Sequence, residues 1–273
     1  MRATKPQLDK PTTGWRADLP PPCCPPTEKL PPIGKPPNFA SDICLELHTS
    51  RLINRTIVVL CAFAVVPCAI VLLMTLSVRE LKTNPLSFLL TLSMAFGMGL
   101  GAVAMLRTGI APPRDEPIRF NRKRGKVYVY RFHSGGPISR KGWGIHPIVF
   151  NWEDLRAEAW SRISPTPSGV PIFARGVDLA VVAPGTNQVI DRFQLAGSNA
   201  DGEHMWAMAR AFMNQGPEAL PQYPNPPRDW NNDVPSYHLA LRLAPKVQWP
   251  EDMDKESRTA PGAVQSQNGC APR

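Results

Sequence analysis

The chain has 273 residues, a net charge of +9 and a pI near 9.5. This positive charge permits nucleic-acid binding, but no recognition motif or ladder of aromatic residues accompanies it, so we expect no nucleic-acid partner. The six cysteines do not suggest a disulfide framework, because Cys23 and Cys24 are adjacent and Cys61 and Cys68 lie within apolar segments.

Residues 1–50 are rich in proline, and eleven of the first forty residues are proline. The apolar periodicity that a packed core requires is missing from this segment. We therefore expect a disordered or polyproline tail. Docking of its proline-rich stretches into an aromatic groove is the alternative.

Two uncharged apolar segments follow, at 56–78 and 85–106, with only six residues between them. A helix rises about 1.5 Å per residue, so about 20 apolar residues cross the roughly 30 Å hydrocarbon core of a bilayer. Both segments exceed this length. The sequence therefore predicts a hairpin of two transmembrane helices within residues 51–110.

Basic residues lie mainly outside this hairpin. Arg51 and Arg55 precede it and seven Lys or Arg residues follow between 107 and 126, whereas the link contains only Arg79 and Lys82. Because Lys and Arg close to a span resist translocation, we expect both termini in the cytoplasm. No Asp, Glu, Lys, Arg or His lies within either span, so the hairpin is predicted to be an anchor and not a transport pathway.

Small residues recur every four positions in the second span. Ser93, Gly97 and Gly101 form one set, and Ala95 and Gly99 form another. This spacing is typical of a helix face that a neighbouring backbone approaches closely. We expect the first helix to pack there, with a homodimer contact as the alternative.

Residues 115–216 predict a cytoplasmic α+β domain. Segments 118–120 and 126–132 flank a turn and indicate one β-hairpin, and segments 177–182 and 188–195 indicate a second. Pro184 followed by Gly185 suits a type II turn in the second hairpin.

The rest of this domain contains one more apolar run, at 145–150, one or two helical turns within 152–160, and an amphipathic helix over 201–216. The helix needs a sheet to cover. We expect a partly open β-barrel closed by a C-terminal helix, as in pleckstrin-homology-like domains.

Residues 217–273 are again rich in proline and predict an irregular segment. Residues 237–243 are expected to add one strand, and residues 251–273 are expected to form a frayed tail.

The chain carries little recognisable chemistry. Its histidines are scattered, and no Cys-x-x-Cys or His-x-x-x-His spacing is present, so we expect no metal site and no cofactor. We also expect no catalytic residue. The alternative is a membrane-anchored hydrolase that assembles His133, His146 or His204 with a carboxylate.

The carboxylates Glu153, Asp154 and Glu158 alternate with Arg156 and Arg162. This alternation is typical of a solvated face, which is the interpretation that we adopt.

Six basic residues crowd the first predicted hairpin. They are Arg119, Arg122, Lys123, Arg124, Lys126 and Arg131. Anionic lipid headgroups attract each such residue by about 1 kcal/mol near a membrane surface. Two interpretations stay open: the cluster only sets the topology, or it binds anionic headgroups and makes the protein a membrane-surface sensor.

The two spans followed by residues 119–128 (Arg-Phe-Asn-Arg-Lys-Arg-Gly-Lys-Val-Tyr), residues 151–155 (Asn-Trp-Glu-Asp-Leu) and the helix with Trp206 resemble an uncharacterised family of two-pass bacterial membrane proteins. The resemblance covers about residues 51–220. It implies a bacterial inner-membrane location, a cytoplasmic domain of unknown function, and an immunity or effector-associated role near type VI secretion loci. Our expectation is a non-enzymatic membrane protein that presents a protein-binding module.

Overall fold

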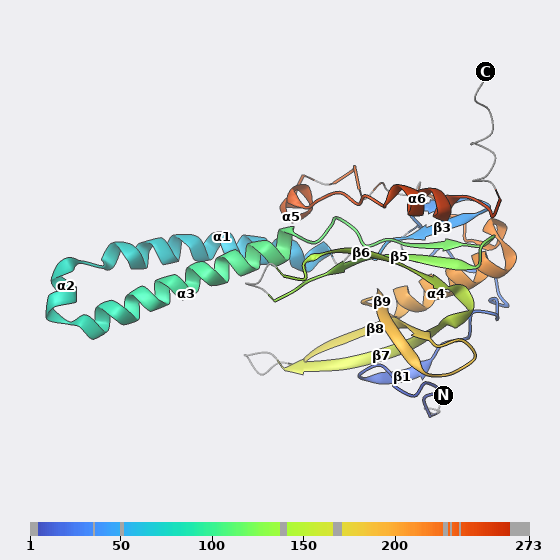
Figure 1. Ribbon diagram of the computed structural model, residues 1–273, viewed down its shortest axis with the longest axis horizontal. Coiled ribbons are helices and arrows are strands. Elements are labelled where there is room, and N and C mark those ends of the chain that lie inside the picture. Colours follow the sequence, from blue (N-terminus) through green and yellow to red (C-terminus); the bar gives the residue numbers. More distant parts are fainter. Residues whose placement is uncertain are drawn as a thin grey trace, which may run out of the picture.

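The computed structural model describes residues 5–34, 36–49, 52–136, 141–165, 171–225, 229, 231–234 and 236–262. Figure 1 shows two parts, a long helical hairpin and a body built from two β-sheets. The hairpin leaves the body at one end.

The helical hairpin consists of α1 (Leu52–Thr75), α2 (Val78–Thr83) and α3 (Pro85–Ile110). Asn84 caps α3 by accepting a hydrogen bond from the backbone N–H of Ser87, and Pro85 occupies the first helical position, where its missing N–H costs nothing. The segments Arg55–Thr75 and Pro85–Ile110 are long and apolar enough to cross a membrane, and only 17% and 11% of their most apolar windows are buried. This confirms two long apolar helices whose surfaces the body does not cover.

The two long helices touch through small residues, but not through the set predicted from the sequence. Ala95, Ala102 and Gly109 are the buried positions of α3, and they recur every seven residues, the spacing that keeps one stripe against a partner helix. Of the predicted set, Ala95 alone is buried. A Cβ atom added at Gly97, Gly99 or Gly101 would have no neighbour within 4 Å, and Ser93 is exposed.

The first sheet has the order β2-β3-β4-β5-β6, and all its neighbouring strands are antiparallel. Its strands are β2 (Phe39–Ala40), β3 (Cys44–Leu47), β4 (Ile118–Asn121), β5 (Lys126–His133) and β6 (Gly144–Asn151). The first predicted hairpin is confirmed as β4 and β5. The strand β3 precedes α1, so the whole helical hairpin is inserted between two paired strands.

The second sheet has the order β1-β7-β8-β9 and is also antiparallel. Its strands are β1 (Trp15–Asp18), β7 (Leu155–Pro165), β8 (Pro171–Val182) and β9 (Val189–Ala196). The second predicted hairpin is confirmed as β8 and β9. In its turn the N–H of Thr186 donates to the carbonyl of Ala183, and Gly185 adopts a φ of 71°, which glycine tolerates best.

The helical turns predicted within 152–160 are largely wrong. A short 3-10 helix, η1 (Trp152–Asp154), is followed directly by the strand β7. Leu155, Ala157 and Ala159 are buried at alternate positions, which is the period of a strand with one face on the core.

One core joins the two sheets to α4 (Asn199–Gln215), which Ser198 caps at the start and Gly216 ends. The ring centres of Trp206 in α4 and Trp152 lie 5.1 Å apart, and those of Trp152 and Phe120 lie 5.8 Å apart. The predicted helix is therefore confirmed. The predicted barrel is corrected to two separate antiparallel sheets: among the described residues no hydrogen-bonded ladder joins them, and η1 lies between β6 and β7.

The N-terminal segment is not a disordered tail over its described residues. It contributes three strands, and Leu45 and Leu47 lie in the core. Side chains of α4 hold the proline-rich stretch, with the Trp206 indole donating to the Pro20 carbonyl and Asn214 donating to the Pro22 carbonyl. Proline lacks an N–H but keeps a free carbonyl acceptor, so a proline-rich chain is ordered here by donors from a neighbouring helix.

The C-terminal segment also differs from the prediction. After η2 (Pro217–Ala219), the residues expected to form a strand form the short helix α5 (Leu239–Leu243), which contacts α1 and α3. The expected frayed tail contains α6 (Glu251–Arg258), which packs on β4. Residues 263–273 of that predicted tail lie outside the described residues.

The contact between α1 and α3 gives a matched pair of substitutions. At Gly109 a Cβ atom would lie 2.5 Å from Cγ2 of Val59, whereas at Gly99 it would meet nothing within 4 Å. We expect Gly109→Ala to lower the free energy of unfolding by about 1–3 kcal/mol, because Val59 is β-branched and cannot rotate away freely. Gly99→Ala should leave the stability unchanged or raise it slightly. Unfolding of the full-length protein in mixed detergent micelles measures both, and equal destabilisation would contradict this helix contact.

Candidate functional site

The predicted basic cluster does not form one exposed patch. Arg119 is only 3% exposed, and its guanidinium group pairs with Glu46 and Asp254 and stacks 4.4 Å from the ring centre of Trp249. This residue joins β4 to β3 and to α6. The prediction that Arg119 contacts a membrane surface is therefore wrong.

Three other members of the cluster also bind within the protein. Arg124 donates to the carbonyl groups of Thr259 and Ala260, Lys126 pairs with Glu256 at 3.0 Å, and Arg131 pairs with Asp191 at 2.9 Å. The hydrogen bond from Lys126 is the main cause that lowers the pKa of Glu256 below its usual value. Lys123 is exposed, and Arg122 is partly buried with its guanidinium group beside Gly216.

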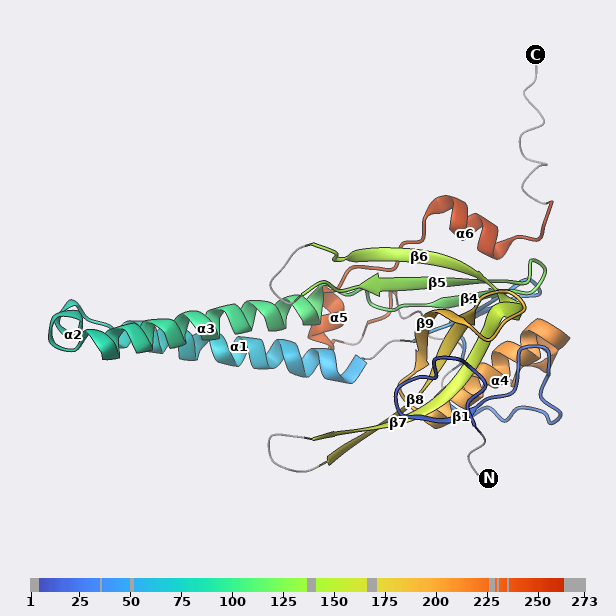
Figure 2. The same cartoon turned by 60° about the horizontal axis from the view of Figure 1, so that its bottom comes forward.

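The turn between β4 and β5 lies at the end of the body opposite the helices, as both views show (Figures 1 and 2). The other end of β5 approaches the helices, since Trp143 beside β6 lies under the guanidinium group of Arg107 in α3, at 4.6 Å. The predicted basic turn is therefore not the part of the domain that faces the base of the hairpin.

A polar cluster holds the base of the hairpin where the chain enters and leaves the first sheet. The carboxylate of Asp115 accepts hydrogen bonds from the backbone N–H of Thr49 at 3.1 Å and from the Asn38 side chain at 3.1 Å. The Thr49 hydroxyl donates to the carbonyl of Glu116 at 2.7 Å. Burial raises the pKa of Asp115 from 3.8 to about 6.

Arg55, in the first turn of the apolar segment of α1, ties the two helices together at this base. Its guanidinium group donates to the carbonyls of Gly109, Pro112 and Pro113, at 3.1, 2.6 and 2.7 Å. A cation at this position also faces the negative end of the α3 dipole. Arg114, which follows Pro113, donates instead to carbonyls around α5, including those of Leu241 and Ala244.

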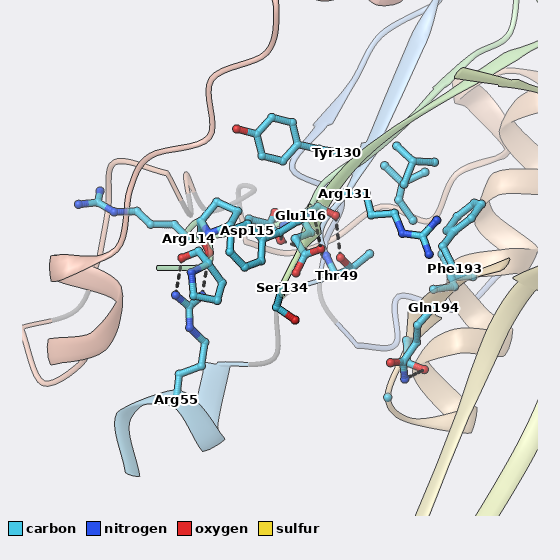
Figure 3. A pocket seen from close by; sticks show the side chains of 18 of the residues that line it. Thr49, Arg55, Arg114, Asp115, Glu116, Tyr130, Arg131, Ser134, Phe193 and Gln194 are labelled. Carbon is cyan, nitrogen blue, oxygen red and sulfur yellow. Dashed lines mark hydrogen bonds between the residues drawn. The ribbon is translucent and has the colours of Figure 1, made fainter. Parts of the chain in front are cut away.

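A cavity of about 610 Å³ lies beside this base (Figure 3). Its walls come from the helix ends, from the linker after α3, and from facing strands of both sheets. They include Arg55 and Val58 of α1, Thr108 and Gly109 of α3, residues 112–116, residues 129–132 of β5, and residues 192–197 at the end of β9.

The wall combines hydrogen-bonding groups with apolar surface. Figure 3 shows Thr49, Glu116 and Ser134 in the middle of the site, with Arg131, Phe193 and Gln194 on one side and Arg55 and Arg114 on the other. Four lining side chains are guanidinium groups and two are carboxyl groups. This arrangement suits binding of a molecule that has both hydrogen-bond acceptors and an apolar part.

The histidines of the hydrolase alternative do not gather in this cavity. His133 and His146 neighbour each other with ring centres 6.3 Å apart, and neither lines the cavity. His204 lies on α4 within 3.1 Å of the Tyr223 hydroxyl, and burial lowers its pKa. Among the described residues no group of three or more His, Cys, Asp or Glu side chains has the arrangement of a metal site.

The carboxylates interpreted as a solvated face are not all solvated. Glu158 of β7 is fully buried and pairs with Arg192 of β9 at 2.8 Å. Burial raises the pKa of Glu158, while the neighbouring guanidinium group opposes that shift.

The comparisons with known proteins extend these observations. One protein-family model matches residues 98–261, which is more than half of the chain. The chain belongs to the DUF6708 family, a family of unknown function. No curated protein and no solved structure gives a significant match. The DUF6708 match begins inside α3 and continues past α6, so it includes C-terminal residues that the earlier resemblance left out.

No motif in the sequence indicates the cavity, because its lining residues come from segments that are far apart in the chain. In the sequence Arg55 precedes the first span and Arg114 follows the second, a placement that indicates membrane topology and not a binding site. The available signal was Asp115 with Glu116, an acidic pair within the otherwise basic segment that follows the second span.

Arg119 and Lys123 provide a matched test of the buried cluster. Arg119→Ala leaves Glu46 partly buried without its cation, so we expect the free energy of unfolding to fall by about 3 kcal/mol. Lys123→Ala changes an exposed residue of the same hairpin and should change the free energy of unfolding by less than about 0.5 kcal/mol. Denaturant unfolding of the full-length protein in detergent compares them, and similar values for both variants would argue against the cluster as a clamp.

Asp115 predicts a pH dependence of stability. Its pKa in the folded protein, about 6, lies above its ordinary value of 3.8, so its contribution to stability is fully present below pH 3.8 and is lost as the pH rises through about 6. Asp115→Asn removes this titration. We therefore expect the stability of the wild type relative to the variant to decrease between pH 4 and pH 7, measured as paired unfolding midpoints. A constant difference across this range would show that Asp115 does not titrate there.

Proposed function

We propose that this DUF6708 protein is a two-pass membrane protein that binds an amphipathic, membrane-derived ligand in the cavity between its helices and its two sheets. The observation that supports this proposal most directly is the composition of the cavity wall. Val58 and Gly109 belong to the apolar helices, whereas residues 129–132 and 192–197 belong to the two sheets. A molecule in the cavity touches all three parts at once.

The membrane location is supported by the surface of the hairpin. A core helix of a soluble protein buries most of its apolar side chains, but α1 and α3 leave theirs exposed, including Phe63, Leu73 and Phe96 at 51%, 48% and 67%. Covering them with lipid is more favourable than leaving them in water. The basic residues outside the hairpin favour a cytoplasmic body, and the resemblance to two-pass bacterial proteins favours the inner membrane.

The ligand chemistry follows from the wall. A volume of about 610 Å³ accommodates a small molecule or a lipid headgroup with the first part of its chains, but not a whole phospholipid. Of the four guanidinium groups in the wall, those of Arg131 and Arg192 already pair with Asp191 and Glu158. Those of Arg55 and Arg114 donate to backbone carbonyl groups, which leaves their positive charge to attract an anion. We therefore place a phosphate-bearing headgroup among the polar residues and apolar atoms near Val58 and Phe193. The proposed site for an anionic headgroup is therefore the cavity and not the basic turn between β4 and β5.

We propose that the role is non-enzymatic. A protein partner and a link to type VI secretion rest on the family resemblance alone, and they stay predictions. Crosslinking in the cell followed by mass spectrometry of co-purified proteins tests them.

Filling the cavity tests the binding proposal. A Cβ atom at Gly197 would meet only the Gln194 amide, at 3.7 Å, so Gly197→Phe can enter the space without displacing the backbone. The control is Asn187→Phe in the exposed turn between β8 and β9. Native mass spectrometry of full-length protein purified in mild detergent should detect bound phospholipid in the wild type and control, and much less in Gly197→Phe. Equal lipid retention in all three, at equal unfolding midpoints, would overturn the proposal.

A further inference from the structure

The β7–β8 hairpin carries an uncovered apolar pair near its tip. Ile163 of β7 and Phe173 of β8 are direct cross-strand partners. Their side chains are 65% and 62% exposed, which is unusual for two large apolar neighbours on one sheet face. The pair therefore requires a reason beyond the packing of the described residues.

The pair continues the inner face of the second sheet. Side chains on a strand alternate between faces, so Ile163 and Phe173 share a face with Ala159 and Val177, which are buried in the body. Closer to the body this face is covered by the core. Towards the tip the polar pair Ser161 and Arg175 comes next on this face, and the apolar pair Ile163 and Phe173 follows it beyond the region that the described protein covers.

The direction of the hairpin indicates what covers it. In both views the tip of β7 and β8 projects from the body on the same side as α1 and α3, and it extends about as far as the body ends of these helices (Figures 1 and 2). The first sheet reaches the same level, because Trp143 packs against Arg107 near the end of α3. If α1 and α3 cross a bilayer, the tip meets the surface of that bilayer.

We propose that the tip of the β7–β8 hairpin inserts Ile163 and Phe173 into the interfacial layer of the bilayer that α1 and α3 cross. Arg175, exposed on the same face two residues further along β8, lies where it can pair with lipid phosphates. The partner is the lipid surface itself. This inference rests on the proposed membrane crossing and adds a second, separate contact between the protein and the membrane.

The test measures the depth of single sites in the full-length protein. Cys23, Cys24, Cys61, Cys68 and Cys270 are replaced, and buried Cys44 is kept. An environment-sensitive fluorophore is then attached at Ile163→Cys or Phe173→Cys, and the protein is placed in nanodiscs of phosphatidylcholine and phosphatidylglycerol, with or without lipids that carry a spin-label quencher near the start of the acyl chain.

Two control sites make the result decisive. Ile190→Cys lies in β9 towards the opposite end of that sheet and is 61% exposed, close to Ile163 in residue type and exposure. Phe96→Cys lies in α3 and reports whether the helical hairpin is in the bilayer. We expect strong quenching at residues 96, 163 and 173 and none at residue 190.

The outcomes separate the two hypotheses. Quenching at residue 96 with residues 163 and 173 as unquenched as residue 190 overturns the tip contact and leaves the membrane crossing intact. An absence of quenching at residue 96 overturns the membrane crossing, and with it the tip contact. Quenching at 163 and 173 that disappears in Arg175→Glu would further identify the phosphate layer as the site of contact.

Discussion

The antiparallel pairing of β3 with β4 is the constraint on which the rest of the structure depends. Leu47 pairs with Ile118, so the chain leaves one strand, forms the whole helical hairpin, and returns to the adjacent strand. Both ends of the hairpin are thereby fixed side by side in one sheet. Two helices that start and finish at the same end of one strand pair place the body on a single side of any membrane that they cross, independently of the charge distribution.

The same pairing explains why polar side chains gather at the base. Strand pairing satisfies the backbone of β3 and β4, whereas the described residues between these strands and the helices, 48–49 and 111–117, lie outside the strands and need other partners. There the Asp115 carboxylate accepts a hydrogen bond from the backbone N–H of Thr49. The Arg55 guanidinium group donates to the carbonyl of Gly109 at the end of α3. On the face of the strand pair that points away from the core, Arg119 and Asn121 bind α6, whose last carbonyls accept hydrogen bonds from the Asn121 amide. The pair is therefore held at the end of its strands nearest the helices and on this outer face.

Local signals in the sequence were sufficient for the helical hairpin, for both β-hairpins and for α4. Pro184 with Gly185, Ser198 and Gly216 each act within a few residues of their own position. The N-terminal strands, the helix α6 and the cavity depend on contacts between distant segments, which one sequence does not reveal. Glu158 and Arg119 show the difficulty most clearly: a charged residue in an alternating pattern indicates an exposed face, yet both are buried because Arg192, Glu46 and Asp254 arrive from other strands and helices.

The junction between the helices and the two-sheet body bears on how the body is oriented relative to α1 and α3. Any tilt of the body relative to the helices would act at their junction, which is formed by the strand pair, by α5 and by the Arg107–Trp143 contact, and the cavity lies beside this junction. A ligand in the cavity bridges α1, α3, β5 and β9, so it stabilises one tilt over others only to the extent that it binds that tilt more tightly. The proposed contact of the β7–β8 tip with the bilayer would favour one orientation of the body from a second point. On these two proposals together, occupancy of the cavity and the orientation of the body on the membrane would be coupled.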